Sequence, residues 1–148
     1  MNYNHIEVLL VEDNPDDAKL TIRTLKRENL ANNLIHLKDG AEALDFIYAE
    51  GAFTGRDTAY NPRVILLDLK MPKVNGLEVL ERVKGDPTTK TIPIVILTSS
   101  DEDPDIKKAY ELGANSYIVK PVDFTSFAKV IAELGFYWVF MNQPANGS

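Results

Sequence analysis

The sequence predicts an α/β protein in which helices cover both faces of a parallel β-sheet. Short runs of Val, Ile and Leu alternate with amphipathic segments five times along the chain. Such runs are typical of strands buried on both faces of a parallel sheet, and alternating strands and helices join through right-handed crossovers. A length of 148 residues suits one domain with a substantial core. We therefore expect one (βα)5 domain over residues 1–141 and a disordered polar tail over 142–148.

The individual elements follow from the apolar runs and from helix-capping residues. Asn14 and Asp39 are expected to cap the first two helices, because their side-chain oxygens accept hydrogen bonds from free backbone N–H groups. Pro15 suits the first turn of the first helix, and Leu20, Ile22 and Leu25 are expected on its buried side. A loop is expected over 51–62, before the third strand. The five strands are expected at residues 7–11, 34–37, 64–67, 94–97 and 116–119, each followed by a helix.

Composition and charge exclude several classes of function. The net charge is −6 and no run is rich in Lys or Arg, which argues against nucleic-acid binding. The chain has no cysteine, so disulfides, zinc–thiolate sites and thiol catalysis are excluded. The first residues lack the pattern of a signal peptide, and no apolar run approaches the roughly 20 residues of a membrane span. These features predict a cytoplasmic protein without membrane contact.

Polar side chains follow four of the apolar runs. Glu12 and Asp13 end the first run, Asp68 the third, Thr98 the fourth and Lys120 the fifth. Ligands of an open parallel sheet bind outside the carboxyl ends of its strands, where the strand order switches direction. The flavodoxin-like order 2-1-3-4-5, one of two common orders, places the first and third strands at that point. The sequence therefore predicts a site at this edge of the sheet.

The three carboxylates suit a divalent cation. They would repel one another strongly without a positive charge among them, and Mg²⁺ prefers oxygen ligands of this kind. We expect Asp13 and Asp68 to bind the cation directly, Glu12 to bind through water, and a backbone carbonyl near Lys70 to add a ligand. The ordinary alternative for any one acid is a solvated strand end or a helix cap.

The same residues suit an aspartyl phosphate. A carboxylate can attack phosphorus, and Asp68 lies on a central strand of the expected order. Phosphoryl transfer depends on positioning and on neutralising charge, which a lysine ammonium and a hydroxyl donor can provide. Lys120 and Thr98 are the candidates for these roles. Taken alone, each could instead be a surface lysine or a strand-end hydroxyl.

Four segments together form a more specific pattern: 8–14 (VLLVEDN), 65–76 (ILLDLKMPKVNG), 93–99 (PIVILTS) and 114–121 (ANSYIVKP). On these segments the chain resembles the receiver domain of response regulators in two-component signalling. The resemblance implies that Asp68 accepts a phosphoryl group from a histidine kinase and that Glu12 and Asp13 hold Mg²⁺. It also implies that Thr98 and Lys120 contact the phosphoryl group. The resemblance spans residues 6–134.

Two further roles are implied by the resemblance. Receiver domains have a cis peptide bond where Lys120 precedes Pro121, and an aromatic switch residue where Tyr117 stands. The alternative for Tyr117 is an ordinary half-buried tyrosine on an edge strand. Asn75 replaces an Asp that is common before the glycine of this turn, with no expected effect on the chemistry.

The C-terminal helix carries more aromatic surface than packing requires. Phe136 and Phe140 lie opposite its apolar face, with Tyr137 at one flank, and exposed apolar patches mark interaction sites. These three residues are the expected interface of a homodimer. In the alternative, the helix breaks at Gly135 and the rings fold back onto the core. This aromatic C-terminus and the long 51–62 loop resemble stand-alone regulators that accompany cyanobacterial phytochrome-type kinases.

The expected function is that of a single-domain response regulator that signals through protein contacts or relays its phosphoryl group. It would assist its own phosphorylation and dephosphorylation without turning over a separate substrate, so we do not expect an enzyme. A phosphatase of the haloacid dehalogenase-like family needs a second Asp where Lys70 stands. A flavin-binding module needs a phosphate loop after the first strand, where this chain is acidic. A third alternative is a receiver-like domain that works without phosphorylation. The presence of Glu12, Asp13 and Asp68 together argues against it.

Overall fold

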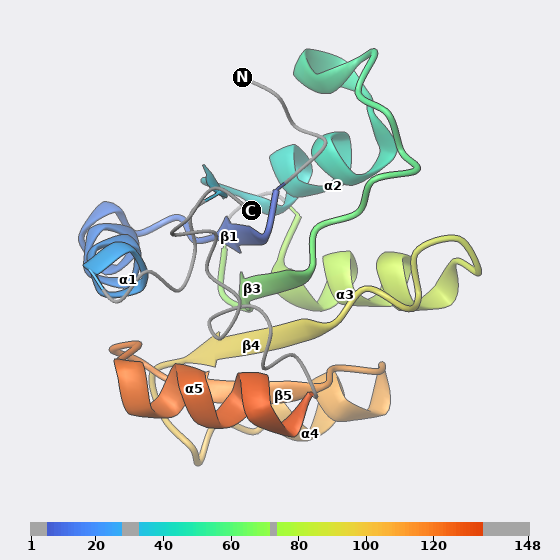
Figure 1. The fold of residues 1–148 in the computed structure, drawn as a ribbon. Coiled ribbons are helices and arrows are strands. Elements are labelled where there is room, and N and C mark those ends of the chain that lie inside the picture. Colours follow the sequence, from blue (N-terminus) through green and yellow to red (C-terminus); the bar gives the residue numbers. More distant parts are fainter. Residues whose placement is uncertain (1–5, 28–32, 72–73, 135–148) are drawn as a thin grey trace.

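Five parallel strands form the central sheet of the computed structural model, which describes residues 6–27, 33–71 and 74–134. The strand order is β2-β1-β3-β4-β5 (Figure 1). This is the order predicted from the sequence, and it confirms the flavodoxin-like fold class. The strands are β1 (Val8–Val11), β2 (Leu34–Leu37), β3 (Val64–Asp68), β4 (Ile94–Thr98) and β5 (Ser116–Val119).

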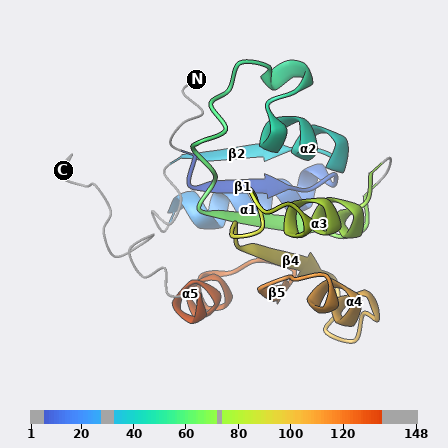
Figure 2. The same cartoon turned by 90° about the vertical axis from the view of Figure 1, so that its right-hand side faces the viewer.

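Helices cover both faces of the sheet. The helices α1 and α5 lie on one face, and α2, α3 and α4 lie on the other (Figure 2). Asn14 and Asp39 cap α1 and α2 as predicted, since their side chains accept backbone N–H groups of the first turn. Asn75 and Asp123 cap α3 and α5 in the same way. The helices are α1 (Pro15–Arg27), α2 (Gly40–Tyr48), α3 (Gly76–Gly85), α4 (Asp105–Glu111) and α5 (Phe124–Glu133), with a short 3-10 helix, η2 (Gly51–Phe53).

The buried face of α1 differs from the prediction at one position. Ala18, Thr21 and Leu25 are buried, whereas Leu20 is 47% exposed. Leu20 lies about 200° around the helix from Ala18, because each residue turns the helix by about 100°. Leu25 lies within about 20° of Ala18 by the same reckoning and faces the sheet.

The segment after α2 is held in place by a buried arginine. The Nε and Nη2 atoms of Arg56 donate to the carbonyls of Phe46 and Ile47 at 2.6 and 2.9 Å, and its guanidinium stacks on the Phe46 ring. Nη1 donates to the carbonyl of Tyr60 at 2.8 Å. These contacts place a positive charge on carbonyl groups at the C-terminal end of α2, where the helix dipole favours a cation. The predicted 51–62 loop is therefore a fixed part of the fold and contains η2.

The register of the strands brings their ends to one level. Val11 of β1 lies beside Leu67 of β3, so Glu12 follows β1 at the level of Asp68. Thr98 of β4 lies beside Val119, which places Lys120 just past β5 at the same edge. Among the described residues, no helix is long and apolar enough to cross a membrane.

Candidate functional site

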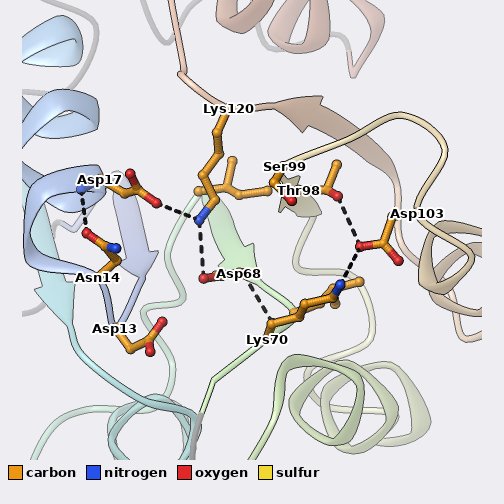
Figure 3. Close-up of a pocket in the computed structure, with 11 residues that line it drawn as sticks. Asp13, Asn14, Asp17, Asp68, Lys70, Thr98, Ser99, Asp103 and Lys120 are labelled. Atoms are coloured by element: carbon orange, nitrogen blue, oxygen red, sulfur yellow. Dashed lines mark hydrogen bonds and ion pairs between the residues drawn. The ribbon is translucent and has the colours of Figure 1, made fainter.

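A pocket of about 260 Å³ lies at the carboxyl ends of the strands (Figure 3). Five of the predicted site residues line it, and they come from the ends of four different strands. Glu12 has no exposed surface and reaches the pocket through its contact with Lys120. The five lining residues are Asp13, Asp68, Lys70, Thr98 and Lys120.

The ammonium of Lys120 lies among three carboxylates. Its Nζ atom is 2.8 Å from Glu12 Oε1, 3.1 Å from Asp17 Oδ2 and 3.3 Å from Asp68 Oδ2. Burial by itself lowers the pKa of Lys120, but the hydrogen bonds that its ammonium donates to Glu12 and Asp17 and the charge of Asp68 outweigh this effect, so the pKa lies above its usual value. Lys120 is therefore fully charged at neutral pH and offsets the repulsion among these acids.

Glu12 has the most perturbed carboxyl group of this cluster. Burial, and to a smaller extent the neighbouring Asp68, raise its pKa to about 7, although Lys120 acts in the opposite direction. Both of its oxygens have partners, because Oε1 contacts Lys120 and Oε2 accepts the N–H of Asn14 at 3.2 Å. Near neutral pH, Glu12 exchanges a proton while Lys120 stays charged.

The carboxylates of Glu12, Asp13 and Asp68 fit a hard divalent cation. One oxygen from each lies within 4.8 Å of the others, a spacing that a single ion can bridge. Asp13 lines the pocket and is more accessible than Glu12. The donor set contains oxygen alone, which favours Mg²⁺ or Mn²⁺ over softer metals.

A second group of contacts lies on the other side of the pocket. The carboxylate of Asp103 is 3.3 Å from Lys70 Nζ and accepts a hydrogen bond from Thr98 Oγ1 at 3.3 Å (Figure 3). Asp103 and Asp17 were not among the predicted site residues. Asp17 lies in the first turn of α1, which begins directly after the acids at the end of β1, and this nearness in the sequence was a signal for it. The sequence offers no comparable signal for Asp103, because an irregular loop positions it.

The loop after Asp68 is packed tightly against the start of α3. A side chain on Gly76 would bring its Cβ within 2.5 Å of the Asp68 carbonyl oxygen and of Leu69 Cα. The Gly76 N–H donates to the Leu69 carbonyl at 2.9 Å. Only glycine allows this approach, so Gly76 helps to fix the backbone that carries Asp68.

The remaining predicted residues have different outcomes. The Lys120–Pro121 peptide bond is cis. Tyr117 is half-buried, and its ring packs edge-to-face against Tyr110 of α4, with the ring centroids 6.3 Å apart. Its role as a switch stays a prediction. The predicted interface residues Phe136, Tyr137 and Phe140 lie outside the described residues, as does the predicted tail at 142–148.

Residues 8–132 match the family model of the response regulator receiver domain. The chain belongs to this family. Receiver domains are the parts of two-component systems that histidine kinases phosphorylate on an aspartate, and they are not enzymes in the ordinary sense. The predicted boundaries of the domain, 1–141, stay a prediction.

Several relatives of this receiver domain are regulators of phytochrome systems. The structure of the bacteriophytochrome response regulator RtBRR is 51% identical, covers 97% of this chain and 86% of that one, and has a TM-score of 0.84. The bacteriophytochrome response regulator AtBRR is 49% identical over 90% of this chain and 94% of that one, with a TM-score of 0.83. Response regulator Rcp1 from Synechocystis is 36% identical over 89% of this chain and 88% of its own length. The predicted resemblance to phytochrome-associated regulators is confirmed.

Because the pKa of Glu12 is raised, we expect the free energy of unfolding to depend on pH in the absence of metal. The folded protein binds the Glu12 proton more tightly than the unfolded chain, so this residue's contribution is complete below pH 4.5 and is lost as the pH rises through about 7. When the pH rises from 5 to 8, the wild type should therefore lose about 2 to 3 kcal/mol of its free energy of unfolding through Glu12. Glu12→Gln cannot ionise at this position and should not show this loss.

Urea unfolding in a chelating buffer at several pH values measures this difference. Glu81→Gln, at an exposed position of α3, is the control and should keep the wild-type slope. Parallel curves for the wild type and Glu12→Gln would contradict the assignment of a near-neutral proton to Glu12.

Proposed function

We propose that this receiver domain accepts a phosphoryl group from a histidine kinase on Asp68 and signals through the resulting change in its protein contacts. One observation carries the proposal: the Asp68 carboxylate opens into the pocket beside the Lys120 ammonium, with the Thr98 hydroxyl in the same pocket. A nucleophile, a cation and a hydroxyl donor thus lie together at one edge of the sheet, as phosphoryl transfer requires.

The transfer itself makes one bond and breaks one bond. An oxygen of Asp68 attacks the phosphorus of a phosphohistidine, an O–P bond forms, the N–P bond breaks, and the leaving imidazole takes a proton from solvent. The Lys120 ammonium is 3.3 Å from Asp68 Oδ2, so it lies within reach of an oxygen of a phosphoryl group on Asp68. Thr98 can donate its hydroxyl to another. Attack of water on phosphorus later reverses the modification in the same pocket.

A magnesium ion is proposed to be held by Asp13, Asp68 and the Lys70 carbonyl, with Glu12 acting through water. When bound, the metal neutralises charge on the phosphoryl oxygens. The oxygen-only donor set of the pocket supports this assignment, and a Mn²⁺-bound form of the relative Rcp1 has been solved.

Two relatives support the choice of partner. A phosphorylated form of the cyanobacterial phytochrome response regulator RcpA is known, and it is 34% identical to this chain with a TM-score of 0.74. RtBRR and AtBRR are described as bacteriophytochrome response regulators. We infer that the phosphoryl donor of this chain is a phytochrome-type histidine kinase. Tyr117, next to Tyr110 on α4, is the proposed switch that reports phosphorylation to the surface.

Asp68 should be the only phosphoacceptor. Incubation with acetyl phosphate and Mg²⁺ should add one phosphoryl group to the wild type and none to Asp68→Asn, because an amide is not a nucleophile towards phosphorus. Intact-protein mass spectrometry measures the added mass. Asp16→Asn, exposed in the first turn of α1, is the control and should be phosphorylated like the wild type. Phosphorylation of Asp68→Asn at the wild-type rate would refute the assignment.

The two acids after β1 should differ in their effect on metal binding. Asp13→Ala should weaken Mg²⁺ binding more than Glu12→Ala, because Asp13 lines the pocket whereas both Glu12 oxygens already accept hydrogen bonds. The titration belongs at pH 8, where Glu12 is largely ionised. Isothermal titration calorimetry gives both dissociation constants. Equal losses would contradict the order proposed here.

A homodimer is the proposed assembly. The face formed by α4, β5 and α5 has a hollow of about 350 Å³, and its lining residues Tyr110 and Val119 are 44% and 37% exposed. The hollow has both polar and apolar lining residues. Exposed apolar side chains gathered on one face mark an interaction surface, and a twofold dimer is the commonest way to cover one. Phe136, Tyr137 and Phe140, which follow α5 in the sequence, are proposed to extend it.

Charge on the C-terminal aromatic residues should separate such a dimer. Phe136→Glu with Phe140→Glu removes apolar surface whose burial contributes roughly 1.5–3 kcal/mol for each side chain, so the double variant should be monomeric. Light scattering at micromolar concentrations, with and without acetyl phosphate, measures the mass. Leu20→Glu, which replaces an exposed apolar side chain of α1 outside the proposed face, is the control and should leave the dimer intact. A wild type that stays monomeric in both conditions would exclude the homodimer.

A further inference from the structure

The carboxylate of Asp103 holds two side chains that face the phosphorylation pocket. Its Oδ2 atom is 3.3 Å from Lys70 Nζ and accepts the Thr98 hydroxyl at 3.3 Å. Only 6% of the Asp103 side chain is exposed, whereas 68% of the Lys70 side chain is. The carboxylate is thus a fixed part of the pocket wall, and Lys70 reaches it from the solvent side. Figure 3 shows this group on one side of the pocket and Lys120 on the other.

The second carboxylate oxygen of Asp103 accepts a hydrogen bond from the start of α4. Oδ1 accepts the N–H of Asp105, the first residue of α4, at 2.9 Å. The Asp103 carbonyl accepts the N–H of Ile106 at 3.1 Å. The hydrogen bond from Asp105 is the main reason that the pKa of Asp103 lies below its usual value, and Lys70 and Thr98 lower it further. One ionised carboxylate therefore joins the pocket to the first turn of a helix.

The two contacts on Oδ2 compete with the proposed chemistry. The Thr98 hydroxyl has a single proton, which it shares between the Ser100 carbonyl at 3.0 Å and Asp103 at 3.3 Å. That proton cannot also be donated to a phosphoryl oxygen. The side-chain ammonium of Lys70 is likewise held by Asp103, whereas the backbone N–H of Lys70 donates to Asp68 Oδ1 at 3.1 Å. A phosphoryl group carries more negative charge than a carboxylate and offers three acceptor oxygens.

We propose that Asp103 is an internal anion that holds Thr98 and Lys70 away from Asp68 until a phosphoryl group displaces it. The inference rests on the proposed phosphorylation of Asp68 and adds a positioning residue to it. Displacement frees Oδ2 while Oδ1 remains on Asp105, so the loss of two contacts in the pocket changes the first turn of α4. Asp103 thereby sets how readily the pocket accepts the phosphoryl group and links that event to the helix.

Beryllium fluoride with saturating MgCl2 is the probe, since it occupies the place of a phosphoryl group without transfer, and 19F NMR measures its binding to the full chain. Asp103→Asn removes the charge but keeps an oxygen that can accept the N–H of Asp105. It should bind the probe about three- to tenfold more tightly than the wild type, the size expected for losing a partly exposed ion pair and one hydrogen bond. Asp101→Asn removes the same charge from an exposed position of the same loop and should bind like the wild type.

A spectroscopic signature separates this role from a merely structural one. In the wild type, the amide signal of Asp105 should shift when beryllium fluoride binds, and in Asp103→Asn the shift should be smaller because the displaced contacts are already gone. The gain in affinity should also shrink in a Lys70→Met background, since the two residues act as a pair. Asp103→Ser, whose hydroxyl oxygen can also accept the N–H of Asp105, provides the same comparison if Asp103→Asn does not fold.

Either of two results would overturn the inference: affinity no higher than that of Asp101→Asn, or an undiminished shift of Asp105. If either result occurs while the wild type is phosphorylated on Asp68, the inference fails and the proposed function stands. A wild type that neither binds the probe nor accepts phosphate removes the proposed function, and the inference with it.

Discussion

The concentration of negative charge at one edge of the sheet is the constraint on which the site depends. Parallel strands in register bring Glu12, Asp13 and Asp68 together, and oxygens of the three lie within 4.8 Å of one another. Such a group is stable only with positive charge among its members. Lys120 supplies that charge from the end of β5, within 3.3 Å of both Glu12 and Asp68. The same ammonium is then available to a phosphoryl group.

The two lysines of the pocket have different surroundings. Lys120 is 16% exposed and contacts three carboxylates, so its position is set by the fold. Lys70 is 68% exposed and contacts Asp103 alone among the ion pairs described for it. Moving a buried ammonium requires other charges to rearrange, whereas moving an exposed one requires little. The pocket thus combines a fixed cation beside Asp68 with a mobile one that a neighbouring acid can hold or release.

The surrounding fold keeps the backbone of this pocket in place. Gly76 lets α3 begin directly against the loop that follows Asp68, at a distance that no other residue allows. Arg56 holds the long 51–62 segment against the end of α2, because it donates to the Phe46 and Ile47 carbonyls of the helix and to the Tyr60 carbonyl of the segment itself. Neither contact takes part in the proposed chemistry. Each contact fixes the position of a loop: the one after Asp68 in the first case and the 51–62 segment in the second.

The sequence by itself predicted the strand order, the caps of α1 and α2, and five residues that line the pocket: Asp13, Asp68, Lys70, Thr98 and Lys120. Buried strands, capping side chains and acids at strand ends are local patterns, and the rules of parallel sheets convert them into a single edge. Leu20 was assigned to the wrong side of α1, because the position of the buried stripe depends on where the helix meets the sheet. Only the tertiary structure decided the parts played by Asp17, Arg56 and Asp103. Their partners lie on other elements or in irregular loops, where contact depends on the path of the backbone and leaves no periodic signal in the sequence.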